Sequence, residues 1–374
     1  MPATVTPSNA PTAPVRRAVV VLGMHRSGTS AVAGCLHGLG VDFGPRLMPA
    51  TEDNPRGYYE HIDIVNLHDR LLLALGGSWD ETRALPPDWL SDDALTGRYR
   101  ADLLDLLRRD LPTAPLWGLK DPRLCRLLPW WEPVWTATNT RPLYVIVRRH
   151  PAEVAASLAR REGFSAGKSH LLWLLHVVEA ERATRSGQRV FLNFKDFLEN
   201  WQTALEPVRA ALDQPWPTPV AGSFVDPALS RSSVAADDSC LPLWVQQADA
   251  ALELGRTGQE AEIRMVFDRL ADSLAAAATL YGATEAERSA DLRHQLETTR
   301  RQARWYEAEW HKARRRTQST NAKKNRTQTS SAAPISHYIN NEKYISNMII
   351  HNISFMRIMG AFLGGRWKKF TNFR

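Results

Sequence analysis

Hydrophobic and polar positions alternate along the first two thirds of the chain in a way that predicts strands joined by helices. Short apolar runs rich in Val, Ile and Leu are typical of parallel strands that are buried on both faces, and each run ends in a turn that leads into a helix-compatible segment. The predicted strands cover about residues 18–24, 117–120, 142–148 and 189–194. Predicted helices begin near residues 29, 60, 151, 169 and 253. This order predicts an α/β fold with a central parallel sheet flanked by helices.

The turn after the first strand reads Gly-Met-His-Arg-Ser-Gly-Thr-Ser over residues 23–30 and predicts an anion-binding loop. Gly23 allows a sharp turn, and the amides at the start of the following helix would face a bound anion. These are the amides of Ser27, Gly28, Thr29 and Ser30. A Walker A loop would carry lysine where this chain has Thr29. The cation of this loop is Arg26 instead, which argues against an ATPase or GTPase.

A second strand-turn-helix unit, residues 142–157, carries another predicted phosphate site. Arg149 stands where the strand ends, Pro151 suits the first position of a helix, and Ser157 lies two helical turns further on. This spacing brings a guanidinium and a hydroxyl to one phosphate group.

Together these motifs resemble those of sulfotransferases that use 3′-phosphoadenosine 5′-phosphosulfate (PAPS), in particular bacterial proteins of carbohydrate-sulfotransferase type. In that family a loop similar to 25–30 binds the 5′-phosphosulfate, and the pattern R-x-P-x-[DE]-V-x-x-S, matched by Arg149 to Ser157, binds the 3′-phosphate. The resemblance covers about residues 17–232 and implies a P-loop sulfotransferase fold with PAPS as cofactor. The implied cofactor-binding residues are His25, Arg26, Ser27, Gly28, Thr29, Ser30, Arg149, Ser157 and, near the end of the matched region, Arg231.

Three residues are the predicted catalytic groups. Glu60 stands near the start of a helix and is the first candidate for the base that takes the acceptor proton, with His61, His68 and Asp69 as alternatives. Arg26 and Lys120 would stabilise negative charge on the transferred and leaving groups. Lys120 belongs to a K-D-x-R pattern similar to a strand-end element of carbohydrate sulfotransferases. Because Pro122 stands where cytosolic sulfotransferases carry a catalytic histidine, the resemblance leaves the base open.

Composition changes the picture mainly at the C-terminal end. The formal charge is +7, but residues 300–374 contain 16 Lys and Arg against 3 Asp and Glu, and residues 1–299 contain 31 against 37. The mildly acidic body therefore argues against nucleic acid as a partner, and the basic end favours an anionic surface. Three cysteines without metal-ligand spacing, Cys35, Cys125 and Cys240, predict a reducing, cytoplasmic setting and no metal site.

The predicted division of the chain has five parts. They are a disordered leader at 1–16, a sulfotransferase domain at 17–285, a charged helix and short coiled coil at 286–316, a flexible linker at 317–335 and a basic amphipathic tail at 336–374. The coiled-coil stripe leaves two interpretations open, a homo-oligomer or a single solvated helix laid on the body. The tail predicts peripheral contact with the inner face of a membrane.

Two other functions remain open at this point. A small-molecule P-loop kinase would use the loop without its usual lysine, and an inactive nucleotide-binding scaffold would bind the cofactor without turnover. The acceptor hydroxyl, on a glycan or glycolipid, is implied by the resemblance alone.

Overall fold

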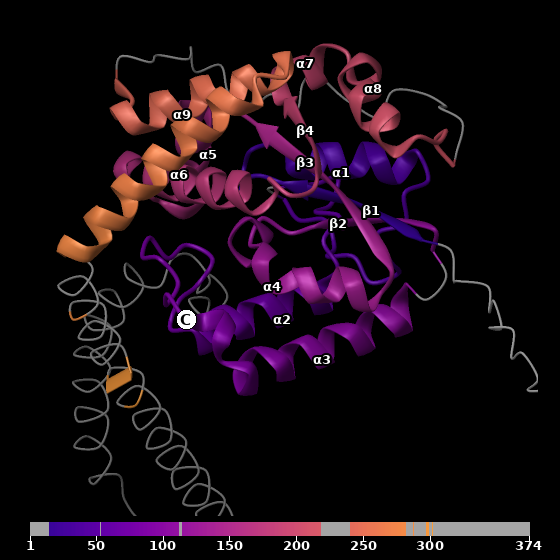
Figure 1. Cartoon of the computed structure of the whole chain (residues 1–374), viewed down its shortest axis with the longest axis horizontal. Coiled ribbons are helices and arrows are strands. Elements are labelled where there is room, and N and C mark those ends of the chain that lie inside the picture. The colour runs from indigo at the N-terminus through magenta and orange to yellow at the C-terminus, as the bar shows by residue number, and fades with distance from the viewer. Residues whose placement is uncertain are drawn as a thin grey trace, which may run out of the picture. The chain divides into compact units, whose positions relative to one another are not determined.

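The computed structural model describes residues 15–52, 54–111, 114–217 and 240–281, together with the single positions 287, 297, 298 and 301. The chain divides into two compact units, Met1–Ala286 and Glu287–Arg374. The first unit holds nearly all of the described residues, and its fold is shown in Figure 1. The predictions for Arg231, the linker at 317–335 and the tail at 336–374 lie outside the described residues, as does most of the predicted coiled coil.

In the described part of the chain, four parallel strands form the central sheet in the order β2-β1-β3-β4, which confirms the predicted α/β class. They are β1 (Arg16–Leu22), β2 (Leu116–Lys120), β3 (Thr140–Arg148) and β4 (Gln188–Asn193). Val20 of β1 stands in register with Leu119 of β2 and Tyr144 of β3. Because all strands run in one direction, their carboxyl ends meet at one edge, which is where open α/β sheets bind ligands.

Helices cover both faces of this sheet (Figure 1). The described helices are α1 (Thr29–Gly38), α2 (Ile62–Ala74), α3 (Asp93–Asp110), α4 (Leu124–Ala137), α5 (Pro151–Glu162), α6 (Ala166–Ala183), α7 (Phe194–Glu199), α8 (Trp201–Leu212) and α9 (Leu243–Leu254), with short 3₁₀ turns η1 (Trp89–Ser91) and η4 (Gly255–Thr257). A further helical stretch spans 260–281. The helix predicted to begin near residue 253 begins instead at residue 260, because the chain turns at η4 and Gly258 adopts a left-handed φ of 74° there.

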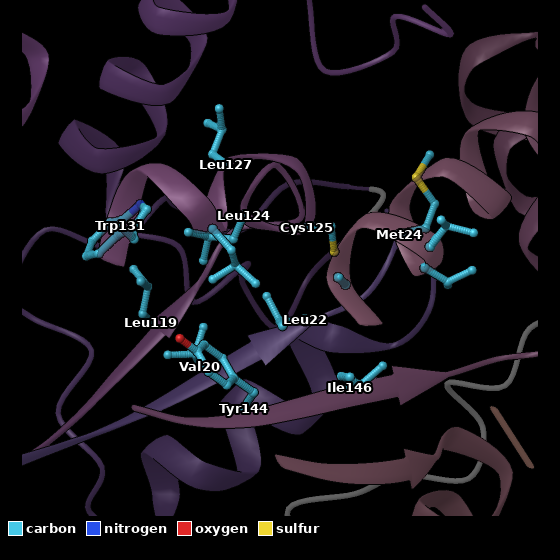
Figure 2. Packing of buried hydrophobic residues seen from close by; sticks show 14 of the residues in the cluster. Val20, Leu22, Met24, Leu119, Leu124, Cys125, Leu127, Trp131, Tyr144 and Ile146 are labelled. Carbon is cyan, nitrogen blue, oxygen red and sulfur yellow. The ribbon is translucent and has the colours of Figure 1, made fainter. Parts of the chain in front are cut away.

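Side-chain alternation along β1 divides the core in two. Ala18, Val20 and Leu22 face a cluster that includes helices α2, α3, α4, α6 and α9. Figure 2 shows this side, where Val20 and Leu22 lie near Leu119, Leu124 and Tyr144. Val19 and Val21 face the second cluster, formed with α1, α7 and α8. From Ala18 to Leu22, β1 is therefore buried on both faces, as its uninterrupted apolar sequence predicted.

Candidate functional site

A cavity of about 560 Å³ lies where β1, β2 and β3 end. Its volume is in the range of small-molecule sites. Residues from both sequence motifs and from the predicted catalytic set share its lining: His25, Arg26, Gly28, Thr29, Ser30, Glu60, Lys120, Arg123, Arg149 and Ser157. The fold therefore collects at one edge of the sheet side chains that are up to 132 positions apart in the chain.

The loop between β1 and α1 is held by backbone geometry that glycine permits. Gly23 has a φ of 148°, and its amide donates a hydrogen bond to the buried Cys125 Sγ at 3.3 Å. Gly28, with a φ of 89°, is the N-cap of α1, and a Cβ there would stand 2.2 Å from the Phe194 ring. A larger residue at position 28 would therefore be both strained and blocked.

One of the four amides that the sequence assigned to the anion is engaged elsewhere. The Ser27 amide donates to the Met24 carbonyl oxygen at 3.1 Å, because the loop closes a tight turn before the helix begins. The Ser27 side chain is 1% exposed and is not part of the cavity lining. The amides at positions 28–30 precede or open α1, where a helix has no internal acceptors for its donors, and they remain the candidate anion-binding amides.

Arg26 connects the two phosphate motifs. Its backbone φ of 71° is unusual for a residue with a side chain, and its Nε donates to Ser157 Oγ at 2.9 Å. Arg149 Nη1 donates to the Arg26 carbonyl oxygen at 2.9 Å. Arg149 also pairs with Glu153 at 2.8 Å and lies over the Phe194 ring at 5.2 Å. Two hydrogen bonds at the cavity thus join Arg26 to Ser157 and to Arg149, which follow it by 131 and 123 positions in the sequence.

Lys120 and Glu60 form a buried ion pair on another part of the lining. Lys120 ends β2, and its Nζ also donates to Ser30 Oγ at 3.2 Å, so it lies beside the first turn of α1. Glu60 lies two residues before α2, and its second carboxylate oxygen is 3.9 Å from Arg123 Nη1. Burial raises the pKa of Glu60, while Lys120 and Arg123 act in the opposite direction. A carboxylate with a raised pKa is suited to take a proton near neutral pH.

The three alternative bases are not in the cavity lining. His61 Nε2 lies 3.0 Å from an Asp110 carboxylate oxygen, on the side of α3. His68 is fully buried between Asp121 and Trp131, and Asp69 is paired with Arg123. Glu60 is therefore the one of the four candidates that the fold presents to the cavity.

His25 lines the cavity as a neutral group. Its ring lies 4.4 Å from that of Trp79, at a 51° angle between the planes. Burial, together with Arg123, His176, Arg161 and Lys120, holds the pKa of His25 well below its usual range. At neutral pH His25 therefore offers hydrogen bonds and no positive charge.

Sequence reasoning missed several residues of the lining, including Trp79, Arg160, Arg161 and Phe194. Helical spacing was an available signal for Arg160 and Arg161, because residues three and four positions after Ser157 share its face of α5. No sequence signal marked Trp79, which lies in the irregular segment after α2.

Among the described residues, one group has the geometry to approach a metal ion: His61, Asp63 and Asp110. Arg46 and Arg109 already pair with these two carboxylates, and the group is not part of the cavity lining. It therefore has no part in the candidate site.

No protein-family model and no curated protein matches the sequence. Among solved structures, the chain is similar to the sulfotransferase domain from the Synechococcus PCC 7002 olefin synthase, with 16% identity over 70% of this chain and 97% of that domain and a TM-score of 0.39. It is also similar to the sulfotransferase domain from the curacin biosynthetic pathway, with 14% identity over 59% of this chain and 84% of that domain and a TM-score of 0.32. At these identities and TM-scores the likeness carries no functional argument.

Proposed function

We propose that this protein is a sulfotransferase that moves the sulfuryl group of PAPS to a hydroxyl of an acceptor. The observation that carries the proposal is the junction of the two phosphate motifs, in which Arg26 bonds to Ser157 and Arg149 bonds to the backbone of Arg26 at the edge of one cavity. Two anion sites so close together suit a ligand with two separated phosphate groups better than a ligand with a single phosphate chain.

The residues present fit such a donor. Arg26, Lys120 and the amides at the start of α1 supply charge and hydrogen bonds for the 5′-phosphosulfate, and Arg149 and Ser157 supply them for the 3′-phosphate. His25, Thr29 and Ser30 add polar groups to the same lining.

When bound, PAPS supplies the sulfuryl group and a bisphosphate leaving group. In the proposed mechanism Glu60 takes the proton of the acceptor hydroxyl, since its carboxylate is buried beside the cavity and its pKa is raised. Lys120 touches both Glu60 and Ser30, so it can stabilise negative charge at the start of α1 while it orients the base.

Calorimetric binding of 3′-phosphoadenosine 5′-phosphate (PAP) to the full chain tests the donor site, with ATP and AMP as competitors. Tight binding that depends on the 3′-phosphate and on Arg149 supports the proposal. Preference for ATP, with phosphoryl transfer, would favour a kinase, and PAP binding without turnover on any acceptor would favour a scaffold.

The proposed acceptor is a glycan or glycolipid hydroxyl. Trp79 and Tyr58 line the cavity and offer aromatic surface to a sugar ring, although the acceptor class rests chiefly on the resemblance of the sequence motifs. A panel of glycans and glycolipids with radiolabelled PAPS tests this part, and transfer only to phenols or amines would contradict it.

A further inference from the structure

A buried chain of hydrogen bonds runs from the core to the cavity through residues that the proposed mechanism does not use. The Trp131 indole nitrogen donates to His68 Nε2 at 3.0 Å. Because Nε2 of His68 accepts this bond, the ring proton of His68 is on Nδ1. Nδ1 therefore donates to Asp121 Oδ2 at 2.8 Å. The indole of Trp131 thus fixes both the tautomer and the orientation of His68.

The same chain continues from Asp121 to the cavity. The other oxygen of Asp121 accepts from Arg123 Nη1 at 2.9 Å and from the Arg123 amide at 3.0 Å. Asp69 holds the opposite edge of the guanidinium through two further hydrogen bonds. Arg123 therefore cannot rotate freely, and its Nη1 is fixed 3.9 Å from Glu60.

We propose that Trp131, His68 and Asp121 form a positioning relay that holds Arg123 beside Glu60 and so sets the charge environment of that carboxylate. The relay residues are at most 1% exposed, and Arg123 is 8% exposed, so solvent screens their interactions little. Two residues that the sequence suggested as bases thus have other roles, since His68 belongs to the relay and Asp69 binds Arg123 directly.

The charges that face Glu60 decide which substitution tests the relay. Lys120 and Arg123 lower the pKa of Glu60, whereas burial and Asp121 raise it. Arg123→Gln therefore raises the pKa of Glu60, but Asp121→Asn has two opposing effects, because it removes a negative charge and also releases Arg123. Trp131→Phe changes no charge, so it raises the pKa of Glu60 only if the relay holds Arg123 in place.

The experiment measures the pKa of Glu60 by carbon NMR of the full chain labelled at its glutamate carboxyl carbons, with Glu60→Gln to assign the signal. Trp130→Phe is the matched control, because Trp130 is also buried and its indole nitrogen donates to the Thr96 carbonyl oxygen at 3.1 Å, outside the relay. We expect an upward shift in Trp131→Phe, a larger one in Arg123→Gln and none in the control. No shift in Trp131→Phe beyond that of the control would overturn the relay.

A second readout is the rate of PAPS hydrolysis against pH, whose acidic limb should move with the pKa of Glu60; only this readout rests on the proposed function. An upward NMR shift in Trp131→Phe without any PAPS turnover would support the relay and contradict the proposed function. Turnover with an unmoved pKa of Glu60 in Trp131→Phe would contradict the relay alone. If Trp131→Phe fails to fold, His68→Gln decides, since it also changes no charge; an upward shift supports the relay and its absence overturns it.

Discussion

The cavity has two regions that are stabilised in different ways. On the side of the two phosphate motifs, Arg26 bonds to Ser157, and Arg149 bonds to the Arg26 backbone and pairs with the half-buried Glu153. On the other side Glu60, Lys120, Asp121 and Arg123 form a buried network in which each charge has an opposite charge beside it. The first region can exchange its contacts for those of a ligand, whereas the second is part of the folded structure as well as of the site.

The largest expected effect is on stability and comes from the buried network. Asp121→Asn removes the charge that compensates Arg123, and breaking a buried pair in this way costs about 3–5 kcal/mol of unfolding free energy. Urea unfolding at pH 7 measures it. Arg26→Ala is the matched change in the first region and should cost less than about 1.5 kcal/mol. Equal losses in the two variants would remove the distinction between the regions.

The loss of unfolding free energy in Asp121→Asn should depend on pH. Hydrogen bonds and charge pairing with Arg123 and His68 hold the pKa of Asp121 well below its usual range. Its contribution to stability is therefore present above the ordinary aspartate pKa of about 3.9 and is lost as the pH falls below that value. Unfolding measured from pH 6 down to pH 2.5 should show wild type and Asp121→Asn converging in acid. A constant difference over this range would contradict the assignment.

Loss of the Glu60 carboxylate should reduce turnover strongly while donor binding persists. A general base contributes about 10²- to 10⁴-fold to the rate, so Glu60→Gln should lower kcat for PAPS turnover by that order. The measurement pairs kcat with calorimetric PAP affinity. Normal turnover in Glu60→Gln would exclude it as the base without affecting the donor site.

On the side of the two phosphate motifs, the expected effect is on the affinity for PAP. Charge-assisted hydrogen bonds contribute about 1.5–3 kcal/mol, so Arg149→Ala should weaken PAP binding roughly 10- to 100-fold and change stability little. Arg209→Ala is a suitable control, because Arg209 lies on α8, outside the cavity lining, and pairs only with a nearby glutamate among its described contacts. Unchanged PAP affinity in Arg149→Ala would contradict its role at the 3′-phosphate.

The smallest effect on the site is expected from the C-terminal segment. We propose that residues 336–374 bind anionic membranes, since this segment is basic and contains apolar residues beside Trp367. No helix among the described residues is long and apolar enough to cross a membrane. Flotation with anionic liposomes, with and without 336–374, tests the proposal, and PAP affinity should be equal in both forms. Flotation that does not depend on the segment would contradict it.

The sequence predicted those structural features that depend on consecutive residues. The apolar runs predicted the four strands of the described sheet, and the Pro151 signal predicted the first residue of α5. The phosphate motifs are also local, because a loop followed by a helix start is specified within about ten residues. These features follow from backbone preferences that do not need distant contacts.

Only the tertiary structure decided which charged side chains share the cavity. Sequence spacing could not separate Glu60 from His61, His68 and Asp69, since all four lie in or just before one helix. Packing of α2 against α3 and α4 turns His61 toward Asp110 and His68 toward Trp131, and leaves Glu60 beside Lys120. The sequence thus determined the strands, the helices α1, α2, α5 and α6 and the loop predicted to bind an anion. The partners of each buried charge were decided by long-range packing, because desolvation makes a charge stable only where the fold supplies its counterpart.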